Sequence, residues 1–97
     1  MAFTCASLPT TGDILWIDTF EYTEIAGAIY NRLAGYKNVG GSVTLIGTIK
    51  SPQVAEDRTV WEQGLVISGT DVLIQGTGET DATIKWLANV YRTIVLI

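Results

Sequence analysis

Hydrophobic and polar residues alternate along much of this chain, most clearly over residues 82–97. A period of two with β-branched and aromatic residues is typical of a half-buried β-strand. The residues expected on its inward face are Ile84, Trp86, Ala88 and Val90. Both faces become apolar over the last four residues, although chain ends are normally polar. We therefore expect these last residues to be buried, in the domain's own core or against a neighbouring subunit.

Shorter runs of the same kind predict the rest of a β-rich fold. The predicted strands are residues 13–17, 42–50, 58–68, 71–75 and 82–97. Turns or loops are predicted at residues 38–41, 51–57, 69–70 and 76–81, where glycine, proline and polar residues gather. With thirteen threonines and ten glycines in the chain, this spacing favours a small antiparallel β-sandwich or barrel.

Residues 19–34 leave two alternatives open. Asp18 followed by Glu21 matches a capping box at the start of a helix. A helical stripe would consist of Tyr22, Ile25, Ala26, Ile29, Leu33 and Tyr36. Against it, Gly27 in the middle of such a helix costs about 1 kcal/mol relative to alanine, and the first aromatic residues could simply extend the preceding strand. The favoured expectation is a mainly β domain with one helix within residues 19–34.

The segment before the first strand is expected to be an extended N-terminal arm, residues 1–12, ahead of a single domain over residues 13–97. Pro9 stiffens this arm, and its few large side chains gain little by lying on their own domain. We expect the arm to reach a neighbouring subunit and bind there by strand addition or apolar docking.

Composition suggests that partners cover part of the surface. Charged residues make up 16% of the 97 residues, where about 25% is typical. A small domain has the most surface per residue to cover, so we expect the isolated chain to be an oligomer. The residues expected at the interface are Phe3, Leu8, Ile94, Val95, Leu96 and Ile97.

Charge and hydropathy exclude other classes of partner. The net charge is −4, and the six basic residues are scattered, so no patch can neutralise a nucleic-acid backbone. No apolar run approaches the roughly 20 residues that cross a bilayer, and no leading signal segment is visible. A single cysteine rules out an internal disulfide and leans toward a reducing compartment. Neither nucleic acid nor membrane is expected as a partner.

The chain has little catalytic equipment. Histidine is absent, which excludes Ser–His and Cys–His nucleophiles and removes the commonest zinc ligand. Cys5 is therefore expected to be a small buried residue. The carboxylate pairs Glu21/Glu24 and Glu56/Asp57 fall in an expected first helical turn and a loop, where acids are ordinary. We expect no enzymatic activity, no cofactor and no metal.

Three further motifs have ordinary explanations. Residues 8–12 match the LPxTG pattern of sortase substrates, but the whole domain follows them, so we interpret the match as coincidence. Residues 76–79 resemble half of a dinucleotide-binding loop, but Asp81 replaces the third glycine and a strand follows, which favours a turn. Asp71, Glu79 and Asp81 lack EF-hand spacing and are expected to be solvated loop carboxylates.

The tryptophans supply the alternative function. Trp16, Trp61 and Trp86 fall one in each β region. Together with four tyrosines they could line a platform for sugar rings, although in small domains such residues are more often core or interface. A small carbohydrate-binding or adhesion module is therefore the second hypothesis.

The order of elements over Arg58–Ile97 carries a resemblance. A strand, a glycine-rich turn, a short strand, a Gly-Thr-Gly turn and a final Ile84-Lys85-Trp86-x-Ala88 strand follow one another. This arrangement resembles small β-rich virion proteins of tailed bacteriophages, among them capsid decoration (cement) proteins and fibre modules. The resemblance implies a non-enzymatic structural subunit, often trimeric, that is assembled in the host cytoplasm. It also implies docking on a larger capsid or tail protein of the virion.

Overall fold

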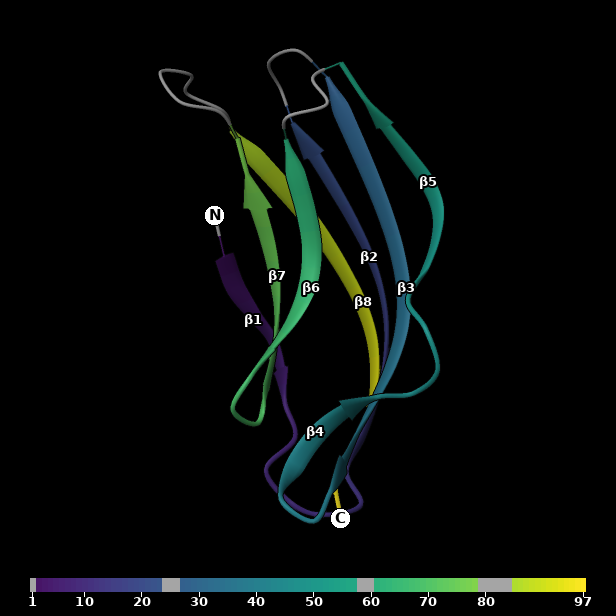
Figure 1. Ribbon diagram of the computed structural model, residues 1–97, viewed down its shortest axis with the longest axis vertical. Helices are drawn as coiled ribbons and strands as arrows, with labels where there is room; N and C mark the ends of the chain where they lie inside the picture. The colour runs from purple at the N-terminus through teal and green to yellow at the C-terminus, as the bar shows by residue number, and fades with distance from the viewer. Residues whose placement is uncertain (1, 24–26, 58–60, 79–84) are drawn as a thin grey trace.

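Two antiparallel sheets make up the protein in its computed structural model, which describes residues 2–23, 27–57, 61–78 and 85–97 (Figure 1). The strands are β1 (Ala2–Ser7), β2 (Ile14–Thr23), β3 (Ala28–Val39), β4 (Ser42–Leu45), β5 (Lys50–Glu56), β6 (Glu62–Ser68), β7 (Asp71–Thr77) and β8 (Trp86–Val95). No helix long and apolar enough to cross a membrane occurs among these residues.

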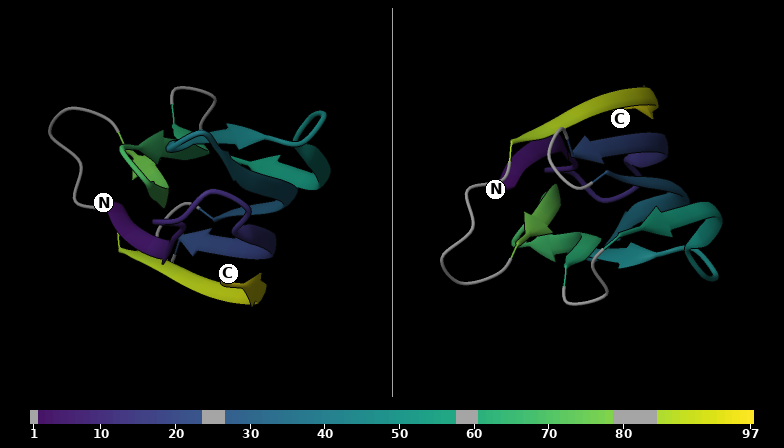
Figure 2. Two further views of the ribbon diagram at one scale, coloured as in Figure 1. Left: turned by 90° about the horizontal axis from the view of Figure 1, so that it is seen from below. Right: turned by 90° about the horizontal axis from the view of Figure 1, so that it is seen from above.

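The smaller sheet has the order β1-β7-β6, and the larger has the order β4-β3-β2-β8, with β5 also paired to β3. The long strand β3 pairs with β5 through its first half and with β4 through its last residues. The two sheets pack face to face as a small β-sandwich of 42 × 24 × 18 Å (Figure 2). The predicted fold class is confirmed.

The prediction of a helix within residues 19–34 is wrong. Strand β2 runs on to Thr23, and it pairs with β3 in one unbroken register from Ile14↔Lys37 to Thr23↔Ala28. Odd positions of β2 are buried and even positions point outward, which is the period of a strand. Gly27 lies in the turn between the strands, where its lack of helix propensity costs nothing. Residues 24–26 lie outside the described residues.

The N-terminal arm is part of the sandwich over residues 2–8. Strand β1 pairs antiparallel with β7, with a register shift between Thr4 and Ala6. The next residue, Leu8, donates its N–H to the Thr70 carbonyl at 2.8 Å and is fully buried. The segment therefore binds its own domain, because strand pairing satisfies its backbone and the core accepts Leu8.

The segment from residue 42 to residue 57 also differs from expectation. The strand predicted over residues 42–50 ends as β4 at Leu45, because Gly47 takes a φ of 67° and turns the chain. The polar loop predicted over residues 51–57 is largely the edge strand β5, whose residues are almost all exposed. Pro52 is tolerated there because an edge strand can leave one N–H side unpaired.

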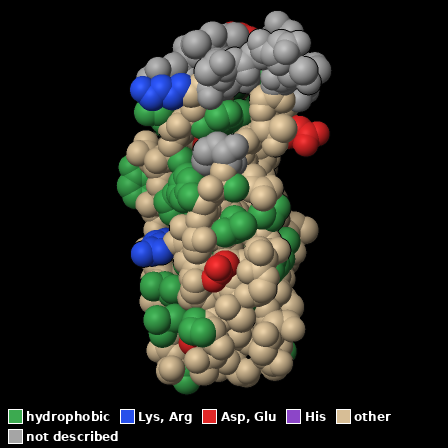
Figure 3. Space-filling model, turned by 90° about the vertical axis from the view of Figure 1, so that its left-hand side faces the viewer, with side chains coloured by type: hydrophobic (Ala, Val, Ile, Leu, Met, Phe, Trp, Pro, Cys, Tyr) green, Lys and Arg blue, Asp and Glu red, His purple; other side chains and the backbone are tan. Residues whose placement is uncertain are grey.

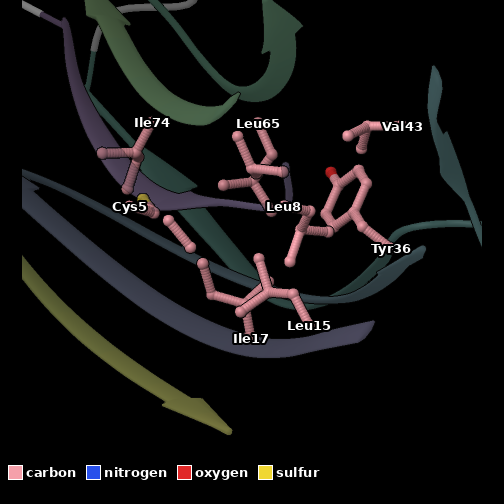
Figure 4. Packing of buried hydrophobic residues seen from close by; sticks show 10 residues of the cluster. Cys5, Leu8, Leu15, Ile17, Tyr36, Val43, Leu65 and Ile74 are labelled. Atoms are coloured by element: carbon pink, nitrogen blue, oxygen red, sulfur yellow. The ribbon is translucent and has the colours of Figure 1, made fainter. Parts of the chain in front are cut away.

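One large apolar cluster fills the space between the sheets. Its buried members are Cys5, Ala6, Leu8, Leu15, Ile17, Tyr36, Val43, Leu65, Val72 and Ile74. Side chains from β1, β2, β3 and β7 point toward one another there (Figure 4). Trp86, expected on an inward face, is half-buried and packs against a second cluster formed by Ala28, Tyr30 and Trp61.

Asp13 and Asn38 hold together the end of the sandwich where the chain enters β2. The buried carboxylate of Asp13 accepts the Thr10 N–H through Oδ2 and the Ile97 N–H through Oδ1, both at 2.8 Å. Asn38 donates its N–H to the Asp13 carbonyl at 3.0 Å and its Nδ2 to the Leu8 carbonyl at 2.7 Å. These bonds tie segments far apart in the sequence to one point.

Candidate functional site

Aromatic and aliphatic side chains gather on the outer surface of the five-stranded sheet. Because odd positions of β2 face the core, its even positions face outward, together with the residues paired to them on β3 and β8. We call this surface the outer aromatic face and define it by Trp16, Phe20, Tyr22, Leu33 and Tyr91. Trp16 and Tyr91 are its most open rings, with 53% and 62% of their surface exposed.

Glycine lets the Trp16 ring lie flat on the sheet. Gly35 is the direct partner of Trp16 across β2 and β3, and a Cβ at Gly35 would overlap the six-membered part of the indole. The indole therefore sits against bare backbone, which is how a glycine in a strand permits close approach. The position of this exposed ring is consequently set by the sheet itself.

The neighbouring rings of the outer aromatic face contact one another. Phe20 and Tyr22 stack with ring centroids 6.5 Å apart and planes 11° apart. Phe20 also meets Tyr91 edge to face at 6.4 Å and 85°. Such arrangements add about 0.5–1.5 kcal/mol beyond the burial of the rings, so these contacts stabilise the cluster within the chain itself.

A shallow hollow of about 440 Å³ lies beside Trp16 on the same face. Trp16, Leu33 and Tyr91 supply its apolar lining, and Asp18 and Lys50 are among its polar groups. Asp18 Oδ1 accepts a hydrogen bond from Asn31 Nδ2 at 2.7 Å. The hollow can hold a flat apolar group or a ring with hydroxyls at its edge.

Glu21 is a buried carboxyl that the sequence analysis placed in a helix. It faces inward from β2, and Gln63 Nε2 donates to its Oε1 at 3.3 Å, while its Oε2 is buried without a hydrogen-bond partner. Burial raises its pKa to about 7, with the Gln63 hydrogen bond and the Arg32 charge acting the other way. A Cβ at Gly76 would lie 2.7 Å from Oε2, so this glycine leaves the space that the carboxyl occupies.

The other proposed carboxylate pair has a structural role. Tyr30 donates its hydroxyl to Glu56 Oε2, and burial together with Glu56 raises the pKa of Tyr30. The Asp57 N–H donates to the Gly27 carbonyl at 3.1 Å. Glu24, the expected partner of Glu21, lies outside the described residues, so neither pair forms an acid/base site in the described structure.

Arg32 links the two sheets beside this buried region. Its Nε donates to Gln63 Oε1 at 2.7 Å and its Nη1 to Ser51 Oγ at 2.6 Å. The guanidinium carbon also lies 5.7 Å from the centre of the Tyr30 ring. The arrangement holds β3 against β6 and β5, which is a stabilising role.

The six predicted interface residues are not brought together at one place. Leu8 is fully buried in the chain's own core, so it is not available to a partner in this fold. Phe3 is exposed on β1 in the smaller sheet. Ile94 is half-buried against the core. The remaining residues, Val95, Leu96 and Ile97, are exposed. The expectation that their own domain buries them is therefore wrong, and their contact with a neighbouring subunit stays a prediction.

The tryptophans also lie in different places. Trp61 is buried, Trp86 is half-buried between the sheets, and Trp16 is exposed on the outer aromatic face. The hypothesis that all three tryptophans form one platform for sugar rings is therefore wrong. Sequence reasoning missed the outer aromatic face because the first residues of β2 are apolar on both sides, and alternation alone cannot show which side faces the core.

The remaining motifs take structural roles where the structure describes them. Gly12, the last residue of the LPxTG match, lies in a turn with a φ of 100°. Asp71 accepts a hydrogen bond from Ser7 Oγ at 2.5 Å, while Glu79 and Asp81 lie outside the described residues. Cys5 is buried, which raises its pKa to about 11. Across the described ranges no cluster of three or more acidic or cysteine side chains is placed to hold a metal ion.

Comparison with known proteins adds no relative. The chain matches no protein-family model, and no match is found among curated proteins or solved structures.

Proposed function

We propose that the protein is a non-enzymatic structural subunit that docks on a larger protein through its outer aromatic face. The observation that carries the proposal is the exposed Trp16 ring, seated on Gly35 and continued by the ring cluster of Phe20, Tyr22 and Tyr91. Large ordered aromatic residues are the usual energetic centres of protein interfaces. Their positions on a sheet make them ready to bind without much loss of conformational entropy.

The rest of the surface supports the same proposal. Charged residues are few in the chain, and the face in Figure 3 shows hydrophobic side chains between separated charged ones. Covering the exposed Trp16 and Tyr91 rings with a partner would remove further apolar surface from water, which is favourable.

The class of particle follows from the resemblance to phage virion proteins. We assign the chain the role of a capsid decoration protein that is assembled in the host cytoplasm and resides in the virion. Its partners are copies of itself and a larger capsid or tail protein. A β-sandwich with an ordered apolar face is a suitable scaffold for such docking.

The test uses purified capsids and tails of a tailed phage that encodes this chain. We expect the wild-type chain to co-sediment with one of them, and Trp16→Ala and Tyr91→Ala to weaken binding at least tenfold. Val54→Ala is the matched control, because Val54 is also exposed but lies on β5. Equal binding by all four proteins would refute docking through this face.

One observation favours a carbohydrate-binding module as the second candidate. The hollow beside Trp16 combines two aromatic rings with polar groups from Asp18 and Lys50, as a sugar-ring site would. Trp16 is the exposed tryptophan, so quenching of its fluorescence by added mono- and oligosaccharides would report binding. Saturable quenching that Trp16→Phe abolishes would support this candidate over protein docking.

A further inference from the structure

Strand β8 has an open edge. It pairs along all ten of its residues with β2, without a register shift, and no described strand lies on its other side. Both views in Figure 2 place β8 at the outer margin of the molecule. It is the longest edge strand in the described part of the chain. Such an edge presents a row of N–H and C=O groups that another strand can bind.

The other edges carry features that prevent such pairing, and β8 lacks them. Edge strand β5 has Lys50 and Pro52, and β1 has a register shift after Thr4. Edge strand β6 begins at the charged Glu62 and contains Gly64, and its Gln63 carbonyl already accepts a hydrogen bond from Arg32 Nη2 at 3.2 Å. Strand β4 is only four residues long. Over its whole length β8 contains no proline, and its single charged residue, Arg92, turns back to donate from Nη1 to the Cys5 carbonyl of β1. The edge of β8 is therefore the best template for another strand.

We propose that two copies of the chain pair β8 to β8, antiparallel, about a two-fold axis through Tyr91. A two-fold axis perpendicular to the sheet keeps the outer side of one copy beside the outer side of the other. Side chains alternate between the two sides along a strand, so two facing residues must both have odd numbers or both have even numbers. The sum of their residue numbers is therefore even. The axis through Tyr91 satisfies this condition and pairs nine positions, from 87 to 95.

The side chains favour this register over its neighbours. On the outer side, Leu87 faces Val95 and Asn89 faces Thr93 of the second copy, so apolar meets apolar and polar meets polar. An axis through Val90 would instead place leucine opposite threonine and asparagine opposite tyrosine. An axis through Arg92 would bring the two guanidinium groups together, which is unfavourable. With the axis at Tyr91, each Arg92 faces an uncharged valine.

The pairing accounts for two exposed features of the isolated chain. The open Tyr91 ring lies at the axis beside its copy, and the exposed Leu96 comes next to the half-buried Trp86 of the second copy. The two outer aromatic faces become one continuous surface. The proposal deepens the self-association assigned above but concerns the isolated chain, so it can fail while docking on a particle holds.

A charge swap tests the register. In the proposed dimer, position 89 of each copy faces position 93 of the other, so this pair of positions occurs twice. Within one chain these positions pair with Phe20 and Trp16, so no charge lies opposite them on β2. By analytical ultracentrifugation we expect a wild-type dimer at tens of micromolar. Asn89→Lys/Thr93→Lys should weaken dimerisation at least tenfold, and Asn89→Lys/Thr93→Glu should restore it in a salt-dependent way.

Disulfide formation gives an independent readout that does not depend on these charges. Facing residues of antiparallel strands have Cα atoms about 4.5–5.5 Å apart, which suits a disulfide. Two copies of position 89 would lie about 13 Å apart along the strands. A mixture of Asn89→Cys and Thr93→Cys should therefore cross-link on oxidation, while each variant alone should not.

Four results would overturn the proposal. A wild-type chain that stays monomeric at tens of micromolar would exclude the contact. A trimer, or equal weakening by the two charge variants, would assign self-association to another surface. Cross-linking of each cysteine variant alone, but not of their mixture, would refute the register.

Discussion

Glu21 makes the stability of this protein depend on pH in an unusual direction. Its carboxyl is fully buried, and burial raises its pKa to about 7 from 4.5. Below pH 4.5 the group is protonated in both the folded and the unfolded chain and has no effect. As the pH rises toward 7, the unfolded chain loses the proton first, so the free energy of unfolding falls. Above pH 7 the loss amounts to about 3 kcal/mol.

The substitution Glu21→Gln removes this loss while keeping an oxygen that can accept the Gln63 hydrogen bond. Urea unfolding followed by far-UV circular dichroism should show wild type losing stability between pH 4.5 and 7 and Glu21→Gln losing much less. At pH 8 the variant should be more stable by up to about 3 kcal/mol.

The absence of histidine makes the measurement clear, because no other side chain has an ordinary pKa in this window. Glu62→Gln serves as the control, since Glu62 is exposed on β6. If wild type keeps a constant stability from pH 4.5 to 8, or if Glu21→Gln differs by the same amount at every pH, the argument from burial is refuted.

Substitutions at three further positions test the packing. Trp86→Ala removes a half-buried ring that packs on the second cluster, and unfolding in urea should show a loss of about 3 kcal/mol; an unchanged midpoint would place the ring in solvent. Asp13→Ala leaves two backbone N–H groups without their acceptor and should cost about 2–3 kcal/mol, whereas Asp13→Asn should cost less because one amide oxygen remains. Gly35→Ala must displace the Trp16 ring and should shift its fluorescence and weaken particle docking; wild-type binding would show that the seat of this ring does not matter.

Strand content could be predicted because it depends on local pattern. The alternation over the last strand correctly placed Trp86, Ala88 and Val90 on one side, and all three are half-buried toward the core. Ile84, the fourth residue expected on that side, lies outside the described residues. The glycine turn after Ser68 was also predictable, since Gly69 needs a φ of 61° that other residues avoid. These features depend only on a few residues that are neighbours in the sequence.

Residues 19–34 could not be decided in this way. Their apolar residues fit either a helical stripe or an alternating strand, and the capping pattern of Asp18 and Glu21 favoured the helix. In the folded protein β2 pairs with β8, more than sixty residues later in the sequence, and with β3. Hydrogen bonding on both sides outweighs the small local preference, which amounts to tenths of a kcal/mol per residue.

The candidate site also depends partly on local sequence and partly on contacts between distant segments. The sequence by itself determined that the chain is β-rich, poor in charge and without histidine. Only the tertiary structure decided that Leu8 lies in the core, that Glu21 is buried and that Trp16 faces outward. Burial depends on which strands pair and which sheet covers which face. These are contacts between distant segments, and a strand that is apolar on both sides carries no local signal to choose between them.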